Sequence, residues 1–198
     1  MKTPVFFGVG VILFGFGYLH GQKNIKRMER QYFHILYNLL NKTIKVTHFQ
    51  HLWFLGRTPF ALFWLGVLIV LNWRCGLIAG GIYGLAAGLE RWIKLLIARP
   101  RPFTTFPEQA IMLQPKRPTD FSFPSGDSFR VWFLALVIPA FWGLAWPICA
   151  LFWGIALAVS LGRIAMGVHY PLDVISGTGL GIVSAGLTLF VWQVLGLL

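Results

Sequence analysis

The sequence predicts an all-α protein: an integral membrane bundle of six transmembrane helices, with an additional amphipathic helix at the membrane surface after the first span. Two observations lead to this prediction. Hydrophobic residues make up 57% of the 198 residues and charged residues only 12%, whereas soluble domains carry about 25% charged residues. Apolar stretches of roughly 15 to 25 residues, which can cross a bilayer, also recur six times. This composition argues against an ordinary soluble domain.

The six apolar stretches follow one another at residues 4–18, 59–73, 75–97, 128–144, 147–166 and 171–198. The first could be a signal peptide, but no clear small-residue cleavage site follows it, so we interpret it as a retained span. Tryptophans lie near several proposed ends, where aromatic belts form. The last stretch has Gly177 and Gly181 spaced for close helix contact. We expect one transmembrane domain over residues 1–198.

Residues 20–57, between the first two spans, are mixed and basic. A helical period brings together the apolar residues Tyr32, Phe33, Leu36, Leu39 and Leu40. This pattern predicts an amphipathic helix on the membrane surface, with its cations near the phosphates of anionic lipids. A soluble loop helix packed on the bundle is the alternative.

The net charge of +11 limits the partners of the chain. In so hydrophobic a chain it favours anionic lipid headgroups or phosphorylated substrates, and the absence of a recognisable nucleic-acid-binding motif argues against nucleic acid. Nearly all the charge falls in the loops after spans one, three and five, on one membrane face, with only Lys2 and Arg74 on the other. Cys75 and Cys149 lack metal-type spacing, so we expect two inert buried thiols, with a disulfide as the alternative.

Two segments on the charged face carry residues suited to phosphate. Lys94 ends the third span, and Arg101 follows in a proline-braced turn, so two cations are held at one membrane boundary. Arginine offers a planar fork to phosphate oxygens and lysine a point charge. Before the fourth span, Ser125 is a good helix cap and Gly126 lets a ligand approach the backbone N–H groups. Each signal alone also fits an ordinary structural role.

A third segment adds a nucleophile. Arg163 lies near the end of the fifth span, His169 follows in the break, and Asp173 lies in the first turn of the sixth span. There the carboxylate can turn back toward the histidine. A carboxylate on one ring nitrogen fixes the tautomer and leaves the other nitrogen free to attack.

Together the segments match the pattern Lys-x6-Arg-Pro, Pro-Ser-Gly-His and Arg-x5-His-x3-Asp over residues 94–173, with one exception. The chain thereby resembles the type 2 phosphatidic acid phosphatase superfamily, and within it the compact bacterial membrane lipid phosphatases. The resemblance implies that His169 attacks phosphorus to form a phosphohistidine and that Asp173 orients its ring. It implies a phosphate cradle of Lys94, Arg101, Ser125, Gly126 and Arg163. No metal or other cofactor is expected, because cations and backbone dipoles stabilise the charge.

The exception is Asp127, which stands where the family has a general-acid histidine. Three interpretations are open. Asp127 is a working acid with a pKa raised by burial; or it is ionised at rest, paired with Arg130, and protonated only when phosphate binds; or it is a loss-of-function substitution. A good leaving group, such as a phosphate from a pyrophosphate, needs little acid help.

The resemblance therefore implies an enzyme that removes phosphate from a polyprenyl pyrophosphate, lipid A 1-phosphate, phosphatidylglycerol phosphate or a similar lipid. The alternative is a catalytically impaired protein that binds lipid phosphate. We expect it in the bacterial cytoplasmic (inner) membrane. Positive charge argues for a cytoplasmic site, but the resemblance and the phosphate-binding role of several cations favour the periplasmic face. The sequence does not predict an oligomeric state.

Overall fold

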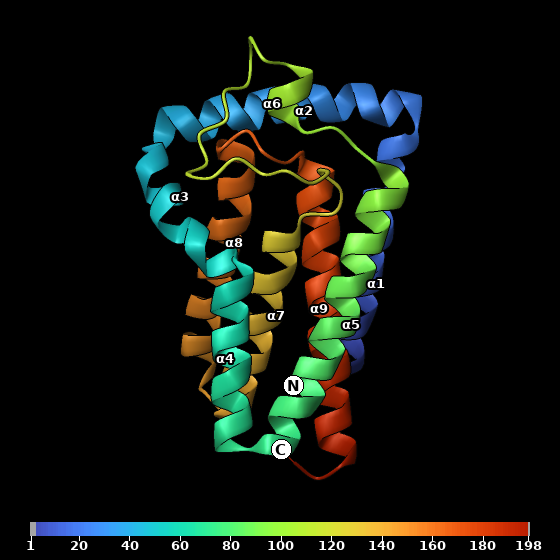
Figure 1. Ribbon diagram of the computed structural model, residues 1–198, viewed down its shortest axis with the longest axis vertical. Helices are drawn as coiled ribbons and strands as arrows, with labels where there is room; N and C mark the ends of the chain where they lie inside the picture. The colour runs from blue at the N-terminus through green and yellow to red at the C-terminus, as the bar shows by residue number, and fades with distance from the viewer. Residues whose placement is uncertain (1–2, 198) are drawn as a thin grey trace.

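The computed structural model describes residues 3–197, and these form helices and loops without a strand. In chain order the elements are α1 (Thr3–Gly17), η1 (Tyr18–Gly21), α2 (Lys23–Thr43), α3 (Val46–Leu52), η2 (Trp53–Gly56), α4 (Thr58–Leu71), α5 (Trp73–Ile97), α6 (Pro102–Thr105), α7 (Gly126–Phe141), α8 (Trp146–Ala165) and α9 (Pro171–Val194). Six of them, α1, α4, α5, α7, α8 and α9, run along the long axis, and α2 lies across one end (Figure 1). The all-α prediction is confirmed.

The six long-axis helices match the predicted spans to within a few residues, but not all have the length of a span. Within residues 3–197, α8 and α9 are long and apolar enough to cross a membrane, and up to four segments qualify if each bent helix pair counts as one. The 14 residues of α4 extend over only about 21 Å, against a hydrocarbon core of roughly 30 Å. Six separate spans therefore stay a prediction.

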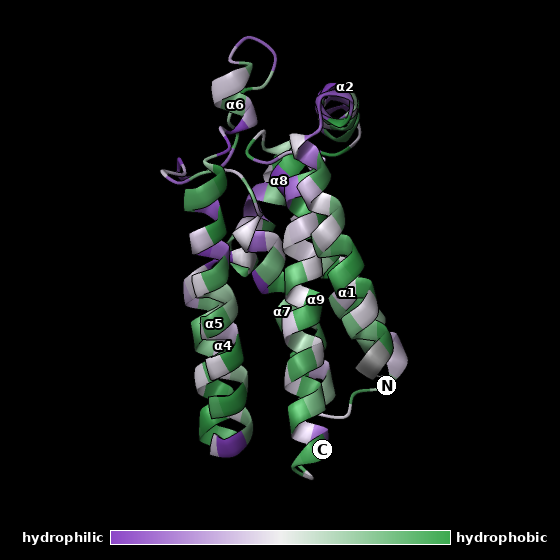
Figure 2. Cartoon of the chain, turned by 90° about the vertical axis from the view of Figure 1, so that its right-hand side faces the viewer, coloured by the Kyte–Doolittle hydropathy of each residue, from purple (hydrophilic) through white to green (hydrophobic). Residues whose placement is uncertain are grey.

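Helix α2 follows α1 after a bend of 104° and has two apolar faces. Phe33, Tyr37 and Leu40 are buried in a cluster with residues of α8 and the 98–124 loop. A second set forms the exposed stripe of α2, in which each side chain is 51–54% exposed: Met28, Tyr32, Ile35 and Leu39. The helix therefore packs on the bundle, as the alternative interpretation has it, and also keeps the outward apolar face that a membrane-surface helix needs. Figure 2 shows α2 end-on, beyond the long helices.

Helices α7 and α9 touch backbone to backbone because glycine occupies the contact. A Cβ added to Gly177 would lie 2.2 Å from the Ser125 carbonyl oxygen, and one on Gly181 would lie 2.5 Å from that of Phe129. The predicted close helix contact is thus confirmed, and it fixes Ser125 against α9. Large apolar side chains of α4, α5, α7 and α9 fill the adjoining core.

The cysteines and Arg74 lie as the sequence predicts. Cys75 and Cys149 are free and buried, as predicted, so the disulfide alternative is wrong. Arg74 lies in the first turn of α5, at the end of the bundle away from α2. Lys2 lies outside the described residues.

Candidate active site

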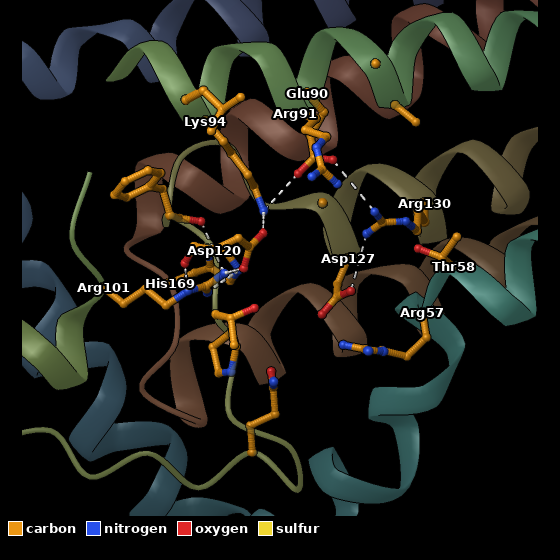
Figure 3. Close-up of a pocket in the computed structure, with 18 residues that line it drawn as sticks. Arg57, Thr58, Glu90, Arg91, Lys94, Arg101, Asp120, Asp127, Arg130 and His169 are labelled. Atoms are coloured by element: carbon orange, nitrogen blue, oxygen red, sulfur yellow. Dashed lines mark hydrogen bonds and ion pairs between the residues drawn. The ribbon is translucent and has the colours of Figure 1, made fainter. Parts of the chain in front are cut away.

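A cavity of about 700 Å³ lies where α5 approaches its C-terminal end and α7 begins. Its walls come from α4, α5, α7, the 98–124 loop and the break between α8 and α9 (Figure 3). The titratable side chains that line it are Arg57, Glu90, Arg91, Lys94, Arg101, Asp120, Asp127, Arg130 and His169. Of the predicted site residues, Lys94, Arg101, Gly126, Asp127 and His169 face the cavity, whereas Ser125, Arg163 and Asp173 are fully buried beside them.

His169 is placed by a sharp reversal of the chain. Gly167 adopts a φ of 71°, and a Cβ there would lie 2.6 Å from the Ile111 carbonyl oxygen, so only glycine fits. The buried ring that follows has Nε2 3.1 Å from Nη1 of Arg101. Burial, and after it the charge of Arg101, lower the pKa of His169 to about 4. The imidazole is therefore neutral at neutral pH, and Nε2 faces a cation in the cavity.

Asp173 reaches His169 indirectly. Its Oδ2 lies 3.6 Å from His169 Nδ1, which is too long for a direct hydrogen bond. Ser122 fills the gap: its hydroxyl donates to Asp173 Oδ2 at 2.5 Å, and its oxygen lies 3.4 Å from Nδ1. The Tyr170 N–H also donates to Oδ2, at 2.9 Å. The structure thus brings the predicted pair together but adds Ser122, which the sequence did not indicate.

A second ion-pair system holds the other side of Asp173. Arg99 Nη1 donates to Asp173 Oδ1 at 2.5 Å, and Arg99 Nη2 donates to Glu29 Oε2 at 2.5 Å. Glu29 also accepts from the Leu172 N–H at 3.1 Å. The side chains of Arg99, Glu29 and Asp173 are 10%, 3% and 0% exposed. Neither Arg99 nor Glu29 was predicted from the sequence.

The two cations of the first motif already hold a carboxylate. Asp120, on the loop before α7, bonds Lys94 Nζ through Oδ2 and Arg101 Nη2 through Oδ1, the latter at 2.7 Å. Its side chain is 53% exposed, whereas those of Lys94 and Arg101 are 9% and 6% exposed. Partial burial raises the pKa of Asp120, but Lys94 and Arg101 outweigh it and hold that pKa well below its usual range. Asp120 was likewise not predicted from the sequence.

Ser125 and Gly126 begin α7 as predicted. Ser125 caps the helix by accepting from the Ser128 N–H, at 3.4 Å, and its own N–H donates to the Asp173 carbonyl oxygen at 2.9 Å. A Cβ on Gly126 would lie 2.7 Å from both Glu90 Oε1 and Arg130 Nη1. A side chain at that position would push these charged groups aside. The start of α7, where the positive end of the helix dipole lies, lines the cavity through Gly126 and Asp127.

Asp127 is held by arginines. Its Oδ2 accepts from Arg163 Nη1 at 2.7 Å, and its Oδ1 lies 3.5 Å from Arg130 Nη1. Arg57, the residue before the first turn of α4, extends toward Asp127 (Figure 3). This geometry stabilises the ionised carboxylate and fits the interpretation in which Asp127 is unprotonated at rest. Arg163 is fully buried, and among the described residues its Nη2 has no hydrogen-bond partner. A buried guanidinium nitrogen without a partner is costly, and an oxyanion would satisfy it.

A family model described as the PAP2 superfamily matches residues 76–196, more than half of the chain. The chain therefore belongs to the PAP2 superfamily, the family that contains the type 2 phosphatidic acid phosphatases. It is 34% identical over 119 residues to an undecaprenyl-diphosphatase of Sulfolobus acidocaldarius, covering 59% of this chain and 50% of that protein. It is 33% identical over 105 residues to a decaprenylphosphoryl-5-phosphoribose phosphatase of Mycobacterium tuberculosis, covering 53% and 54%. The chain thus spans about half the length of these relatives.

Two solved structures share the fold. A transmembrane PAP2-type phosphatidylglycerolphosphate phosphatase from Bacillus subtilis superposes with a TM-score of 0.77 at 20% identity, covering 98% of this chain and 97% of that one. LpxE of Aquifex aeolicus superposes with a TM-score of 0.63 at 26% identity, covering 78% and 93%. Low identity with the first structure means that this likeness concerns the fold alone.

Proposed function

We propose that this chain is a membrane phosphatase that releases phosphate from a lipid phosphate or pyrophosphate through a phosphohistidine at His169. One observation carries the proposal: a neutral, buried imidazole faces Arg101 in a cavity that Lys94 also lines. The unpartnered Nη2 of buried Arg163 lies in the same cluster of charges. Such a set of fixed cations around a nucleophile suits an anionic transition state.

In the proposed mechanism His169 Nε2 attacks phosphorus, and the bond from phosphorus to the leaving oxygen breaks. Lys94, Arg101 and Arg163 stabilise the charge on the equatorial oxygens, together with the first turn of α7. The ring becomes cationic as it is phosphorylated, and Asp173, acting across Ser122, stabilises that charge. Water then attacks the phosphohistidine, the N–P bond breaks, and inorganic phosphate leaves. These steps use side chains and backbone dipoles and require no metal.

Among the candidate substrates we favour a polyprenyl pyrophosphate over lipid A 1-phosphate and phosphatidylglycerol phosphate. Arg57 and Arg91 line the cavity, and among the described residues neither makes an ion pair. They suit a second phosphate group on the substrate. A phosphate leaving group is a stable anion, so its departure needs no proton, which agrees with an Asp127 that is paired with Arg163. The undecaprenyl-diphosphatase similarity points in the same direction.

A second candidate function is lipid-phosphate binding without turnover. Asp127 is the observation that favours it, because an ion-paired carboxylate is a poor donor to an alcohol leaving group. The two functions predict the same phosphate affinity and differ in whether phosphate is released.

We place the protein in the bacterial inner membrane, with its cavity on the periplasmic face. The exposed stripe of α2 supports a membrane-surface position for this helix. Its exposed cations, among them Lys26 and Arg27, suit anionic headgroups. Reporter fusions inserted in the loop at residues 103–120 test the orientation, and a cytoplasmic signal there contradicts it.

The enzymatic proposal is tested with detergent-purified protein and a panel of undecaprenyl pyrophosphate, lipid A 1-phosphate and phosphatidylglycerol phosphate. We expect phosphate release by the wild type, fastest with the pyrophosphate, and loss of release in His169→Ala. His48→Ala, which alters an exposed histidine of α3, is the matched control. Full activity of His169→Ala refutes the phosphohistidine. Phosphate binding without release from any of the three lipids supports the binding function instead.

A further inference from the structure

The surface helix α2 contributes a buried acid to the catalytic end of the molecule. Glu29, Arg99 and Asp173 form a continuous chain of charges, with contacts of 2.5 Å on both sides of Arg99. The Arg99 guanidinium also lies over the Tyr170 ring, 4.0 Å from its centroid. All three charged side chains are at most 10% exposed. At this burial, solvent screens their charges weakly, so the charges act on neighbouring groups.

The balance of this chain determines the field at His169. With two carboxylates and one guanidinium, the chain carries a net charge of −1. Arg99 alone would cancel the charge of Asp173, and Glu29 restores it. The other charged groups around His169 are Arg101 and Lys94, which are paired with Asp120, and Asp127, which is paired with Arg163. Glu29 and Arg99 therefore adjust the effective charge of Asp173, the carboxylate on the Nδ1 side of His169.

We infer that Arg99 and Glu29 are positioning residues that set the orientation and effective charge of Asp173, and through it the proton affinity and phosphorylation rate of His169. This inference rests on the proposed role of His169 as nucleophile. When the ring attacks phosphorus it becomes cationic, and the net charge of −1 on the chain balances that cation. Arg99 anchors Oδ1, so that Oδ2 stays with Ser122 and the ring. Because Glu29 also pairs with Arg99, the positive charge of Arg99 does not cancel the negative charge of Asp173.

The test compares four variants: Arg99→Gln, Arg99→Lys, Glu29→Gln and the double variant Glu29→Gln/Arg99→Gln. Arg74→Gln, which removes an exposed positive charge from the first turn of α5, is the matched control. Two quantities are measured: the pH dependence of kcat/KM, and the rate at which a trapped phosphoenzyme forms. The trapped phosphoenzyme is expected to be acid-labile, as a phosphohistidine is. These readouts separate an electrostatic role from a general loss of folding, which lowers activity equally at every pH.

Arg99→Gln leaves two uncompensated carboxylates, so the acidic limb of kcat/KM shifts upward by about one pH unit. Arg99→Lys keeps the charge, and the double variant restores a net charge of −1, so both keep the limb near its wild-type position. Glu29→Gln leaves a neutral Arg99–Asp173 pair, and phosphoenzyme forms about tenfold more slowly at pH 7. Arg74→Gln changes neither quantity.

An unmoved limb in Arg99→Gln, or an equal shift in Arg99→Lys, overturns the inference. If Arg99→Gln does not purify as a folded protein, Glu29→Gln decides, and an unchanged rate of phosphoenzyme formation overturns the inference in that case. Failure of the proposed function has a different signature. A wild type that releases phosphate without a trapped phosphohistidine, or an active His169→Ala, refutes the nucleophile and not the charge balance of Asp173.

Discussion

Asp120 occupies the place where the phosphate oxygens are proposed to bind. Its two carboxylate oxygens contact Lys94 and Arg101, and the Arg101 Nε also donates to its backbone carbonyl at 2.9 Å. A phosphate group that binds these cations has to displace the carboxylate. The change Asp120→Asn keeps the size of the side chain and removes its charge, so it isolates the competition between the carboxylate and phosphate.

The magnitude follows from the exposure of the carboxylate. Ion pairs of solvent-exposed side chains contribute up to about 1 kcal/mol each, and the Asp120 side chain is 53% exposed although its partners are buried. Two such contacts therefore stabilise the carboxylate by about 1–2 kcal/mol, the lower end applying if the asparagine amide keeps one hydrogen bond. One factor of ten in affinity corresponds to about 1.4 kcal/mol. We expect Asp120→Asn to bind inorganic phosphate or orthovanadate about 5- to 30-fold more tightly.

The assay is competitive inhibition of lipid-phosphate hydrolysis by orthovanadate, backed by calorimetric titration of inorganic phosphate in the same detergent. Glu108→Gln is the matched control, because it removes one negative charge from an exposed position of the same loop. The control should leave the inhibition constant unchanged within about twofold, as expected for a distant screened charge. Unchanged or weaker binding in Asp120→Asn refutes the reasoning, since Asp120 would then hold Lys94 and Arg101 in place for the ligand.

Three further predictions concern the acid, the nucleophile and the helix contact. Asp127→His restores the donor that the family pattern has at this position, and should raise hydrolysis of a monophosphate lipid at least about tenfold while changing pyrophosphate hydrolysis little; equal effects on both substrates contradict the leaving-group argument. The lowered pKa of His169 means that the ring is neutral and active above about pH 4 and protonated and inactive below it; a limb of kcat/KM at the ordinary histidine value contradicts the described burial. Gly177→Ala forces a Cβ to within 2.2 Å of the Ser125 carbonyl oxygen and should destabilise the protein by about 1–3 kcal/mol, measured as thermal unfolding in detergent; Gly15→Ala, where nothing lies within 4 Å, is its control.

The fold was largely predictable because apolar length and periodicity are local properties. The predicted limits of the long helices lie within a few residues of the observed ones. The number of membrane spans was harder to predict, because the limits of a helix do not decide whether it crosses the bilayer: α4 has only 14 residues, and α5 carries Glu90, Arg91 and Lys94 in its last turns. The sequence also did not indicate that α2 has both a buried and an exposed apolar face. The predicted apolar face combines residues of the two: Phe33 and Leu40 are buried, whereas Tyr32 and Leu39 are exposed.

The candidate site was predictable where its residues lie close together in the sequence, as His169 and Asp173 do. It was not predictable where residues from distant parts of the chain contact the site. Ser122 and Asp120 lie in a proline-rich loop, where no periodicity indicates which side chains turn inward. Arg99 lies inside the first motif, at a position that the pattern Lys-x6-Arg-Pro leaves unspecified. Glu29 had a usable signal, because it is the one acidic residue in the basic stretch at residues 20–57. A lone acid among cations is a candidate partner for a buried arginine, and in the structure Glu29 pairs with Arg99.

The exposed stripe of α2 has a consequence for kinetics. If Met28, Tyr32, Ile35 and Leu39 rest among the acyl chains, the cavity is held at a constant depth beside the headgroups. The proposed enzyme then meets a lipid substrate by diffusion within one leaflet and not from bulk water. Its rate should follow the mole fraction of substrate in the bilayer at constant total substrate, so that adding inert lipid slows turnover by surface dilution. Polar replacements along the stripe should weaken this two-dimensional dependence while leaving the chemistry at His169 intact.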